Sequence, residues 1–121
     1  MRNKVLIVDD DLAICTAIET ILSMENYQTI TAHTGLDSLK IAQSEEPDLI
    51  LLDCMLPDMT GKQVVEKMRT YLTLKDTPII LISATHGLRQ LVKDAAIQGI
   101  IEKPFELETL TSTVARYIPS H

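Results

Sequence analysis

Short apolar runs alternate with amphipathic segments along the whole chain. Five runs predict strands: residues 5–8, 27–32, 49–52, 79–82 and 100–101. Three of them are continuously apolar, which is typical of parallel strands that are buried on both faces. Five amphipathic segments predict helices: residues 11–25, 34–44, 64–72, 88–96 and 106–118. This alternation predicts an α/β fold, with a five-stranded parallel sheet covered by helices on both faces.

Helical spacing also predicts which side chains face the sheet. Ile18 and Leu22 lie on the apolar face of the first helix, and Asp11 is its expected N-cap. On later helices the same spacing turns Leu36, Leu72 and Leu107 inward. We therefore expect these leucines to be core residues.

Length and composition fit one domain over residues 1–121, and 45% hydrophobic residues suffice for a core. Cys15 and Cys54 both lie in apolar stretches, so we expect reduced thiols rather than a disulfide or a metal pair. No apolar run approaches the roughly 20 residues of a membrane span, and the first residues do not form a signal peptide. These features predict a cytoplasmic protein that does not contact a membrane.

The charge balance argues against direct binding of nucleic acid. The formal net charge is −6, and lysines and arginines form no cluster. Three tyrosines, one phenylalanine and no tryptophan provide no aromatic platform for stacking bases.

Polar residues follow four of the predicted strands: Asp9 and Asp10, Asp53, Ser83, and Lys103. Parallel strands end at the same edge of a sheet, where ligands of open α/β folds bind. If the first and third strands are neighbours, three carboxylates meet there and raise each other's pKa unless a cation compensates. Mg²⁺ prefers oxygen ligands and is often held by carboxylates together with a phosphate. The residues therefore predict a Mg²⁺-assisted phosphoryl-transfer site.

Each of these residues alone has an ordinary explanation. A single aspartate or serine at a strand end is most often a cap or turn residue, and a single lysine is a solvated charge. The combination at successive strand ends is what favours a site.

Four segments resemble the response-regulator receiver family, in the order of the family's motifs: residues 5–11, 51–61, 82–84 and 102–105. The resemblance covers nearly the whole chain. It implies a doubly wound (βα)₅ sheet with the flavodoxin-like strand order 2-1-3-4-5. It also implies a cis peptide bond between Lys103 and Pro104.

The resemblance further implies a role for each site residue. Asp53 is the expected phosphoacceptor, and Asp9, Asp10, Asp53 and the backbone carbonyl of Met55 are the expected Mg²⁺ ligands. Ser83 is the expected switch hydroxyl, and Lys103 is its companion in binding the phosphoryl group.

A protein of this family is a signalling module rather than an enzyme, although it catalyses its own phosphorylation. The resemblance implies that a histidine kinase or a histidine phosphotransfer protein donates the phosphoryl group. A downstream effector, or a second copy in a phosphorylation-dependent homodimer, then reads the changed surface.

Two features depart from the family pattern, and both lie on the expected output face. One is the residue at position 100. The other is the stretch between Ser83 and Lys103, which is a little short and has residues 96–99 in place of the family's usual Gly-Ala pair. Ile100 stands where the family has an aromatic switch residue, so we expect the readout to differ. Thr85 and Met55 provide no charged or amide group that would orient an attacking water, which predicts slow self-dephosphorylation.

Two other functions remain open from the residues. An aspartyl-nucleophile phosphohydrolase typically has a second aspartate two positions after the nucleophile, where this chain has Met55. A phosphorylation-independent interaction module would normally lack some of the acidic or lysine residues, all of which are present here.

Overall fold

The computed structural model describes residues 3–84 and 97–118. In chain order its elements are β1 (Lys4–Val8), α1 (Leu12–Met24), β2 (Gln28–Ala32), α2 (Gly35–Glu45), β3 (Leu49–Asp53), α3 (Gly61–Met68), the 3₁₀ helix η1 (Leu72–Leu74), β4 (Ile79–Ser83), β5 (Gly99–Glu102) and α5 (Leu107–Tyr117). The helix expected at residues 88–96 and the expectation about Thr85 lie outside the described residues.

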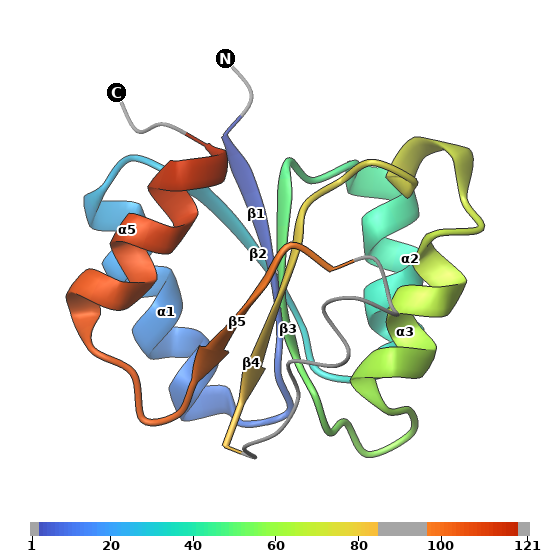
Figure 1. The fold of residues 1–121 in the computed structure, drawn as a ribbon, viewed down its shortest axis with the longest axis horizontal. Coiled ribbons are helices and arrows are strands. Elements are labelled where there is room, and N and C mark those ends of the chain that lie inside the picture. Colours follow the sequence, from blue (N-terminus) through green and yellow to red (C-terminus); the bar gives the residue numbers. More distant parts are fainter. Residues whose placement is uncertain (1–2, 85–96, 119–121) are drawn as a thin grey trace.

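The five strands form one parallel sheet in the order β2-β1-β3-β4-β5. Figure 1 shows α1 and α5 on one face of the sheet and α2 and α3 on the other. The predicted fold class and strand order are therefore confirmed. The chain reverses its direction of winding at β1, so a crevice is expected at the ends of β1 and β3.

Alternate residues of each central strand face two separate cores. On β1, Val5 and Ile7 pack against α1 and α5, whereas Leu6 and Val8 pack on the side of α2 and α3. All of these side chains are at most 1% exposed. Burial on both faces explains why the central strands are continuously apolar in the sequence.

Three leucines expected in the core are exposed instead: Leu36 is 54% exposed, Leu72 85% and Leu107 57%. The sequence interpretation was wrong for Leu72 because α3 already ends at Met68, which leaves Leu72 in η1. Leu36 and Leu107 lie in the first turns of α2 and α5, at the edge where the strands end. Helical spacing predicts which side of a helix faces the sheet, but not which of its turns extend beyond the sheet and remain exposed.

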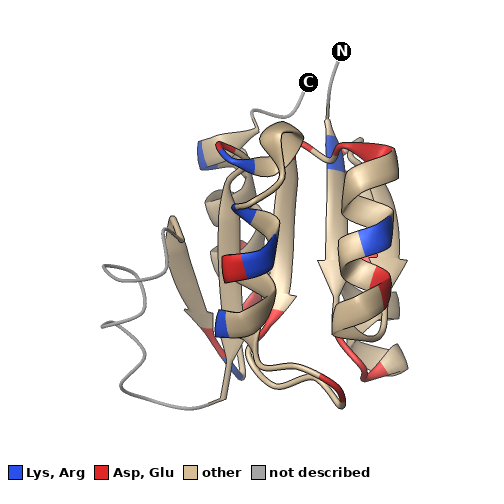
Figure 2. Ribbon diagram, turned by 90° about the vertical axis from the view of Figure 1, so that its right-hand side faces the viewer, with Lys and Arg blue, Asp and Glu red and all other residues tan. Residues whose placement is uncertain are grey.

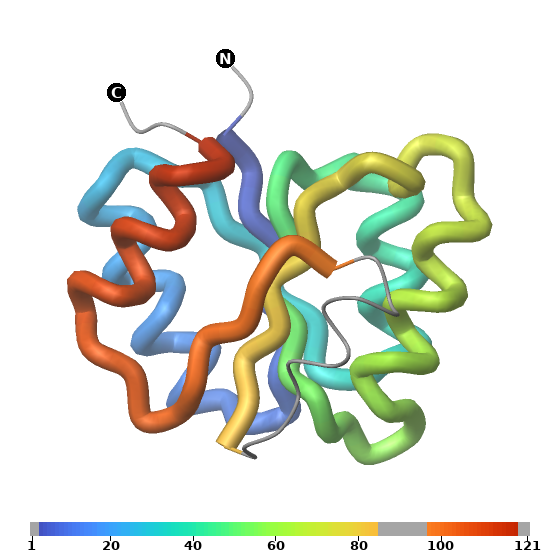
Figure 3. The backbone as a smooth tube through the Cα atoms, viewed as in Figure 1, coloured from blue at the N-terminus to red at the C-terminus, as the bar shows by residue number. Residues whose placement is uncertain are grey.

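Side chains fix the beginnings of three helices at the carboxyl edge of the sheet. Asp11 caps α1, as expected, and accepts hydrogen bonds from the backbone amides of Ala13 and Ile14. Thr34 caps α2, and Thr60 forms a capping box with Gln63 on α3. Figure 3 shows that the start of β1 and the end of α5 lie together at the opposite end of the molecule.

Among the described residues, no helix has both the length and the apolar character that crossing a bilayer requires. Figure 2 shows acidic residues at the ends to which the strand arrows point, in addition to those on the helices and at the opposite end. This carboxyl edge carries the candidate site.

Candidate functional site

The site residues predicted from the sequence lie at the ends of four strands. Asp9 and Asp10 follow β1, Asp53 ends β3, Ser83 ends β4 and Lys103 follows β5. Because β1 and β3 are neighbours in the sheet, Asp9, Asp10 and Asp53 form one cluster, with one carboxylate oxygen of each residue within 4.8 Å of the others.

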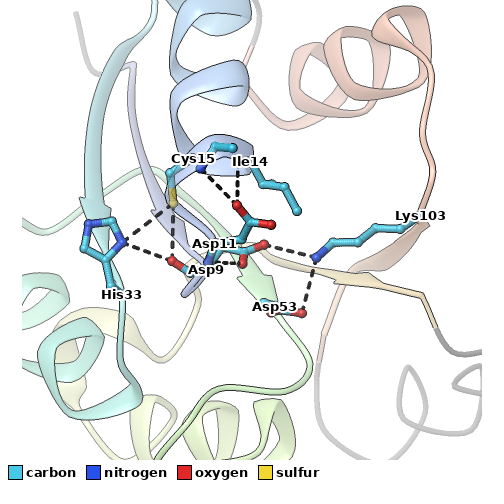
Figure 4. Close-up of polar contacts among 8 residues, drawn as sticks. Asp9, Asp11, Ile14, Cys15, His33, Asp53 and Lys103 are labelled. Carbon is cyan, nitrogen blue, oxygen red and sulfur yellow. Dashed lines mark hydrogen bonds and ion pairs between the residues drawn. The ribbon is translucent and has the colours of Figure 1, made fainter.

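Lys103 lies between two of these carboxylates (Figure 4). Its Nζ atom is 3.1 Å from Oδ2 of Asp9 and 3.7 Å from Oδ1 of Asp53. The other oxygen of Asp9, Oδ1, accepts a hydrogen bond of 2.9 Å from the backbone amide of Asp11. Asp9 is only 2% exposed, so these partners compensate a charge that is almost removed from water.

The surroundings of Asp53 favour its protonated form. Burial raises the pKa of its carboxyl group, as does the negative charge of Asp9, while Lys103 opposes both effects. Burial also lowers the pKa of Lys103, but its contacts with Asp9 and Asp53 together outweigh this and raise it. Among the residues that the structure describes, three carboxylates face one lysine here, and this excess of negative charge favours binding of a further cation.

The donor set fits a hard divalent cation such as Mg²⁺. Asp10 is exposed, whereas Asp9 and Asp53 are largely buried. Carboxylate oxygens are the ligands that Mg²⁺ prefers, and the exposure of Asp10 to solvent would allow the ion to retain water.

The loop between β3 and α3 contributes Met55 to the site. The backbone amide of Met55 donates a hydrogen bond to the carboxylate of Asp53, which opposes the rise in the pKa of Asp53. Met55 also forms an isolated antiparallel bridge with Thr60. The bonds of this bridge run from Leu56 N to Met59 O, at 3.1 Å, and from Gly61 N to Cys54 O, at 2.6 Å, so neither uses the carbonyl of Met55.

Gly61 allows this loop to close tightly against β3. A Cβ atom at position 61 would lie 3.0 Å from Cα of Cys54 and 3.3 Å from the carbonyl oxygen of Asp53. A side chain at this position would therefore press on the backbone that carries the candidate nucleophile.

Ser83 is 2% exposed and is held beside the site by β5. Its carbonyl accepts a hydrogen bond of 2.7 Å from the backbone amide of Lys103. Its hydroxyl interacts with the thiol of Cys54, a hydrogen bond that lowers the pKa of this thiol, although burial has the larger effect and raises it. In this structure Ser83 thus has a partner other than Asp53.

The sequence interpretation assigned no role to Cys15 and His33, which lie behind Asp9. His33 Nδ1 is 3.0 Å from the backbone carbonyl oxygen of Asp9, and Cys15 Sγ is 3.3 Å from the same atom. As a carbonyl only accepts, Nδ1 of His33 carries the proton. Cys15 and Cys54 are both free thiols, as predicted. A single histidine after a predicted strand does not indicate, from the sequence alone, that its ring contacts the backbone of another strand's end.

A second contact that the sequence did not reveal involves Asp58. Its carboxylate accepts hydrogen bonds from the backbone amides of Gly35, at 2.7 Å, and Leu36, at 3.0 Å. These bonds lower the pKa of Asp58. Asp58 lies in a segment that resembles the receiver family, but nothing in that segment identifies α2 as its partner.

The parallel sheet in the order β2-β1-β3-β4-β5, with acidic residues and a lysine at the ends of its strands, is a receiver-type fold. Residues 5–115 match the family model of the response regulator receiver domain. The chain belongs to this family, as the resemblance of its motifs indicated.

Two curated relatives illustrate the range of the family. Sporulation initiation phosphotransferase F of Bacillus subtilis is 30% identical over 98% of this chain and 96% of its own length. Response regulator MprA of Mycobacterium ulcerans is 34% identical over 91% of this chain but only 47% of its own length. The chain thus spans nearly all of the first relative and about half of the second.

Solved structures of receiver proteins have the same fold. Chemotaxis protein CheY4 of Vibrio cholerae superposes with a TM-score of 0.92 at 32% identity, covering 98% of this chain and 100% of that one. The receiver domain of sensor histidine kinase PA1611 from Pseudomonas aeruginosa superposes with a TM-score of 0.89 at 27% identity. That comparison covers 99% of this chain and 100% of the other, whose structure has a magnesium ion in the active site cleft.

Proposed function

We propose that this protein is a phosphoacceptor switch of a two-component phosphorelay, in which Asp53 receives a phosphoryl group. The observation that carries the proposal is the position of Lys103, whose ammonium group lies between Asp53 and Asp9. It places a fixed positive charge beside the carboxylate that would accept the phosphoryl group. We further propose that residues 1–121 act as a single receiver domain.

In the proposed reaction, a carboxylate oxygen of Asp53 attacks the phosphorus of a phosphohistidine. A phosphorus–oxygen bond forms, the phosphorus–nitrogen bond of the donor breaks, and the leaving imidazole keeps the electron pair and takes up a proton. The amide of Met55 orients the attacking carboxylate, and Lys103 neutralises charge on the transferred oxygens.

Asp9, Asp10, Asp53 and the carbonyl of Met55 are the residues that would hold Mg²⁺. When bound, the ion supplies positive charge that stabilises the transferring phosphoryl group. Asp9 has a second task, since it keeps the ammonium group of Lys103 close to Asp53.

A phosphoryl group on Asp53 would compete with the present partners of Lys103 and Ser83 for contacts with these two residues. Lys103 would gain new acceptor oxygens, and the hydroxyl of Ser83 would exchange the Cys54 thiol for a phosphoryl oxygen. Ile100 is partly buried against the core on the side of α2 and α3, so an aliphatic side chain stands where the family has an aromatic switch. We infer that the conformational change reaches the partner surface without rotation of a ring.

The relatives support the remaining parts of the proposal. One is named a phosphotransferase, others are named response regulators, and one solved relative is part of a histidine kinase. We propose a histidine kinase or a histidine phosphotransfer protein as the donor. An effector, or a second copy of the chain, would be the reader, and the cytoplasm would be the compartment.

The test is incubation with acetyl phosphate and Mg²⁺, followed by intact-mass measurement. The wild type, Asp53→Ala and the control Asp37→Ala, which removes an exposed charge from α2, are compared over time. We expect one phosphoryl adduct on the wild type and on Asp37→Ala, and none on Asp53→Ala. The adduct should decay slowly after the phosphodonor is removed.

Other outcomes would favour the alternatives. Sustained release of phosphate without an accumulating adduct would indicate an aspartyl phosphohydrolase. The absence of any adduct at saturating Mg²⁺ would indicate an interaction module that works without phosphorylation.

A further inference from the structure

The two loops that would bind the metal are both attached to a third segment, which carries none of the expected ligands. This segment is the β2–α2 corner, residues 33–36, where the chain leaves β2 and enters α2. On one side it contacts the residues after β1, and on the other it contacts the loop between β3 and α3.

Asp58 makes the contact with the β3–α3 loop. Both of its carboxylate oxygens are used, one by the amide of Gly35 and one by the amide of Leu36, at 2.7 and 3.0 Å. These amides belong to the first turn of α2, where backbone N–H groups have no partner within the helix. A charged acceptor at this position forms stronger hydrogen bonds than a neutral one. Asp58 is exposed, so it serves no packing role that would explain its orientation.

Met59 strengthens the same contact by packing. A Cβ atom at position 35 would lie 2.7 Å from Sδ of Met59 and 2.9 Å from its Cβ and Cγ atoms. Glycine at position 35 therefore lets the loop approach the corner closely. Met59 also accepts the hydrogen bond from Leu56 that closes the turn next to Met55, so the position of this turn depends on the corner.

His33 makes the contact with the other metal-binding loop. Its ring nitrogen holds the backbone carbonyl of Asp9, and the amide of Asp9 donates a hydrogen bond of 3.1 Å to the carbonyl of Ala32. The peptide units on both sides of Asp9 are thus tied to the end of β2. Figure 4 shows His33 and Lys103 on opposite sides of Asp9.

We propose that the β2–α2 corner fixes the two metal-binding loops relative to each other, and that Asp58 is a positioning residue for Mg²⁺. The inference rests on the proposed function, because it concerns the same metal site. Asp58 does not touch the ion. It holds the turn that presents the carbonyl of Met55, while His33 holds the segment that presents Asp9 and Asp10.

Two consequences follow. Without Asp58, the Met55 loop must be ordered when the metal binds, so part of the binding free energy is lost. Conversely, a metal that prefers the ordered loop must strengthen the contacts of the corner, because coupling between two sites is reciprocal. Mg²⁺ should therefore slow hydrogen exchange at the amides of Gly35 and Leu36, although neither residue is an expected ligand.

The test compares Mg²⁺ affinity, by calorimetric or NMR titration, in the full chain and in four variants. Asp58→Ala removes both hydrogen bonds, and Asp58→Asn retains one carbonyl acceptor. Gly35→Ala disturbs the corner from its other side through Met59. Asp37→Ala is the matched control, because it removes an equal, exposed charge from the first turn of α2, the turn that Asp58 contacts.

We expect Asp58→Ala to weaken Mg²⁺ binding by about tenfold or more, as for other residues that orient metal ligands. Asp58→Asn and Gly35→Ala should be intermediate, and Asp37→Ala should stay within about twofold of the wild type, since exposed charges are screened. At saturating Mg²⁺, Asp58→Ala should accept the phosphoryl group nearly as fast as the wild type. Amide exchange at Gly35 should respond to Mg²⁺ in the wild type and not in Asp58→Ala.

Equal Mg²⁺ affinities of Asp58→Ala and Asp37→Ala would overturn the inference and leave the proposed function intact. So would a slow phosphorylation of Asp58→Ala that saturating Mg²⁺ does not restore, because this would indicate a direct role. If Asp58→Ala does not fold, Gly35→Ala and Asp58→Asn decide by the same criteria. A wild type that binds no Mg²⁺ would overturn both the proposed function and this inference.

Discussion

Lys103 forms its closer ion pair with Asp9, at 3.1 Å, rather than with the candidate phosphoacceptor Asp53, at 3.7 Å. The lysine is therefore shared between Asp9 and the candidate nucleophile Asp53. This arrangement keeps the ammonium group in place without fully neutralising the carboxylate of Asp53, whose oxygen would attack phosphorus in the proposed reaction.

Replacing Lys103 by Met should slow phosphorylation of Asp53 by about 100-fold, because a positioned charge on the transferred oxygens is lost. The measurement is the time course of the phosphoryl adduct by intact mass, at fixed Mg²⁺ and acetyl phosphate. Lys62→Met removes an exposed lysine from α3 and serves as the control. An unchanged rate in Lys103→Met would show that the lysine acts only after phosphorylation.

Asp53→Asn should stabilise the protein at neutral pH in the absence of divalent cations. Burial raises the pKa of Asp53 in the folded state, so the folded protein holds this proton more tightly than the unfolded chain. The stability that the group contributes therefore falls as the pH rises from the ordinary value of 3.8 through the raised pKa. Thermal unfolding should show a gain of a few degrees at pH 7, which shrinks as the pH approaches that ordinary value.

A gain that is independent of pH would contradict this explanation and indicate an effect of packing. Asp37→Asn, at an exposed position, is the control for the loss of one charge. It should not reproduce the pH dependence.

Asp10 and Asp11 are adjacent, yet their replacement by alanine should have different effects on stability and on the response to Mg²⁺. Asp11 caps α1, so Asp11→Ala should cost about 1 kcal/mol of stability and leave the stabilisation by Mg²⁺ intact. Asp10 is exposed and is an expected ligand, so Asp10→Ala should change stability without metal by less than about 0.5 kcal/mol. It should abolish the stabilisation by Mg²⁺, which for the wild type is about 2.7 kcal/mol at a concentration 100 times the Kd.

Chemical unfolding with Mg²⁺ and with EDTA measures both effects. The assignment of Asp10 to the metal site fails if its variant retains the full response to Mg²⁺.

Cys15 should resist alkylation in the native protein. Burial and the charge of Asp9 raise its pKa to about 11, from an ordinary value of 9.0, which lowers the reactive thiolate fraction by about a hundredfold. The thiol is also only 1% exposed. Mass spectrometry after treatment with iodoacetamide at pH 8 should find Cys15 labelled only in urea, whereas rapid native labelling would show that the contact with Asp9 opens.

The sequence predicted the strands best where burial on both faces restricts the residues to apolar types. The central strands are buried on both faces, so their residues are apolar, and the first polar residue marks the end of each strand. Asp9 and Asp53 could therefore be assigned to one edge of the sheet from their positions at the ends of β1 and β3 alone. Sequence periodicity wrongly predicted the burial of Leu36, Leu72 and Leu107. It indicates on which side of a helix a residue lies, but not where the helix ends or whether its ends pack against the sheet.

The sequence by itself thus determined the strand order implied by its motifs, the set of residues at the carboxyl edge and the sign of the charge there. Only the tertiary structure decided how these groups are partnered. Lys103 and Asp9 are 94 residues apart, and Asp58 and Gly35 are 23 apart. Local propensity contains no information about such pairs, because the backbone amide of Gly35 looks like any other amide in the sequence. The folded sheet brings these groups together. Their distances then determine that Lys103 balances the charge of Asp9 and that Asp58 attaches the loop between β3 and α3 to α2.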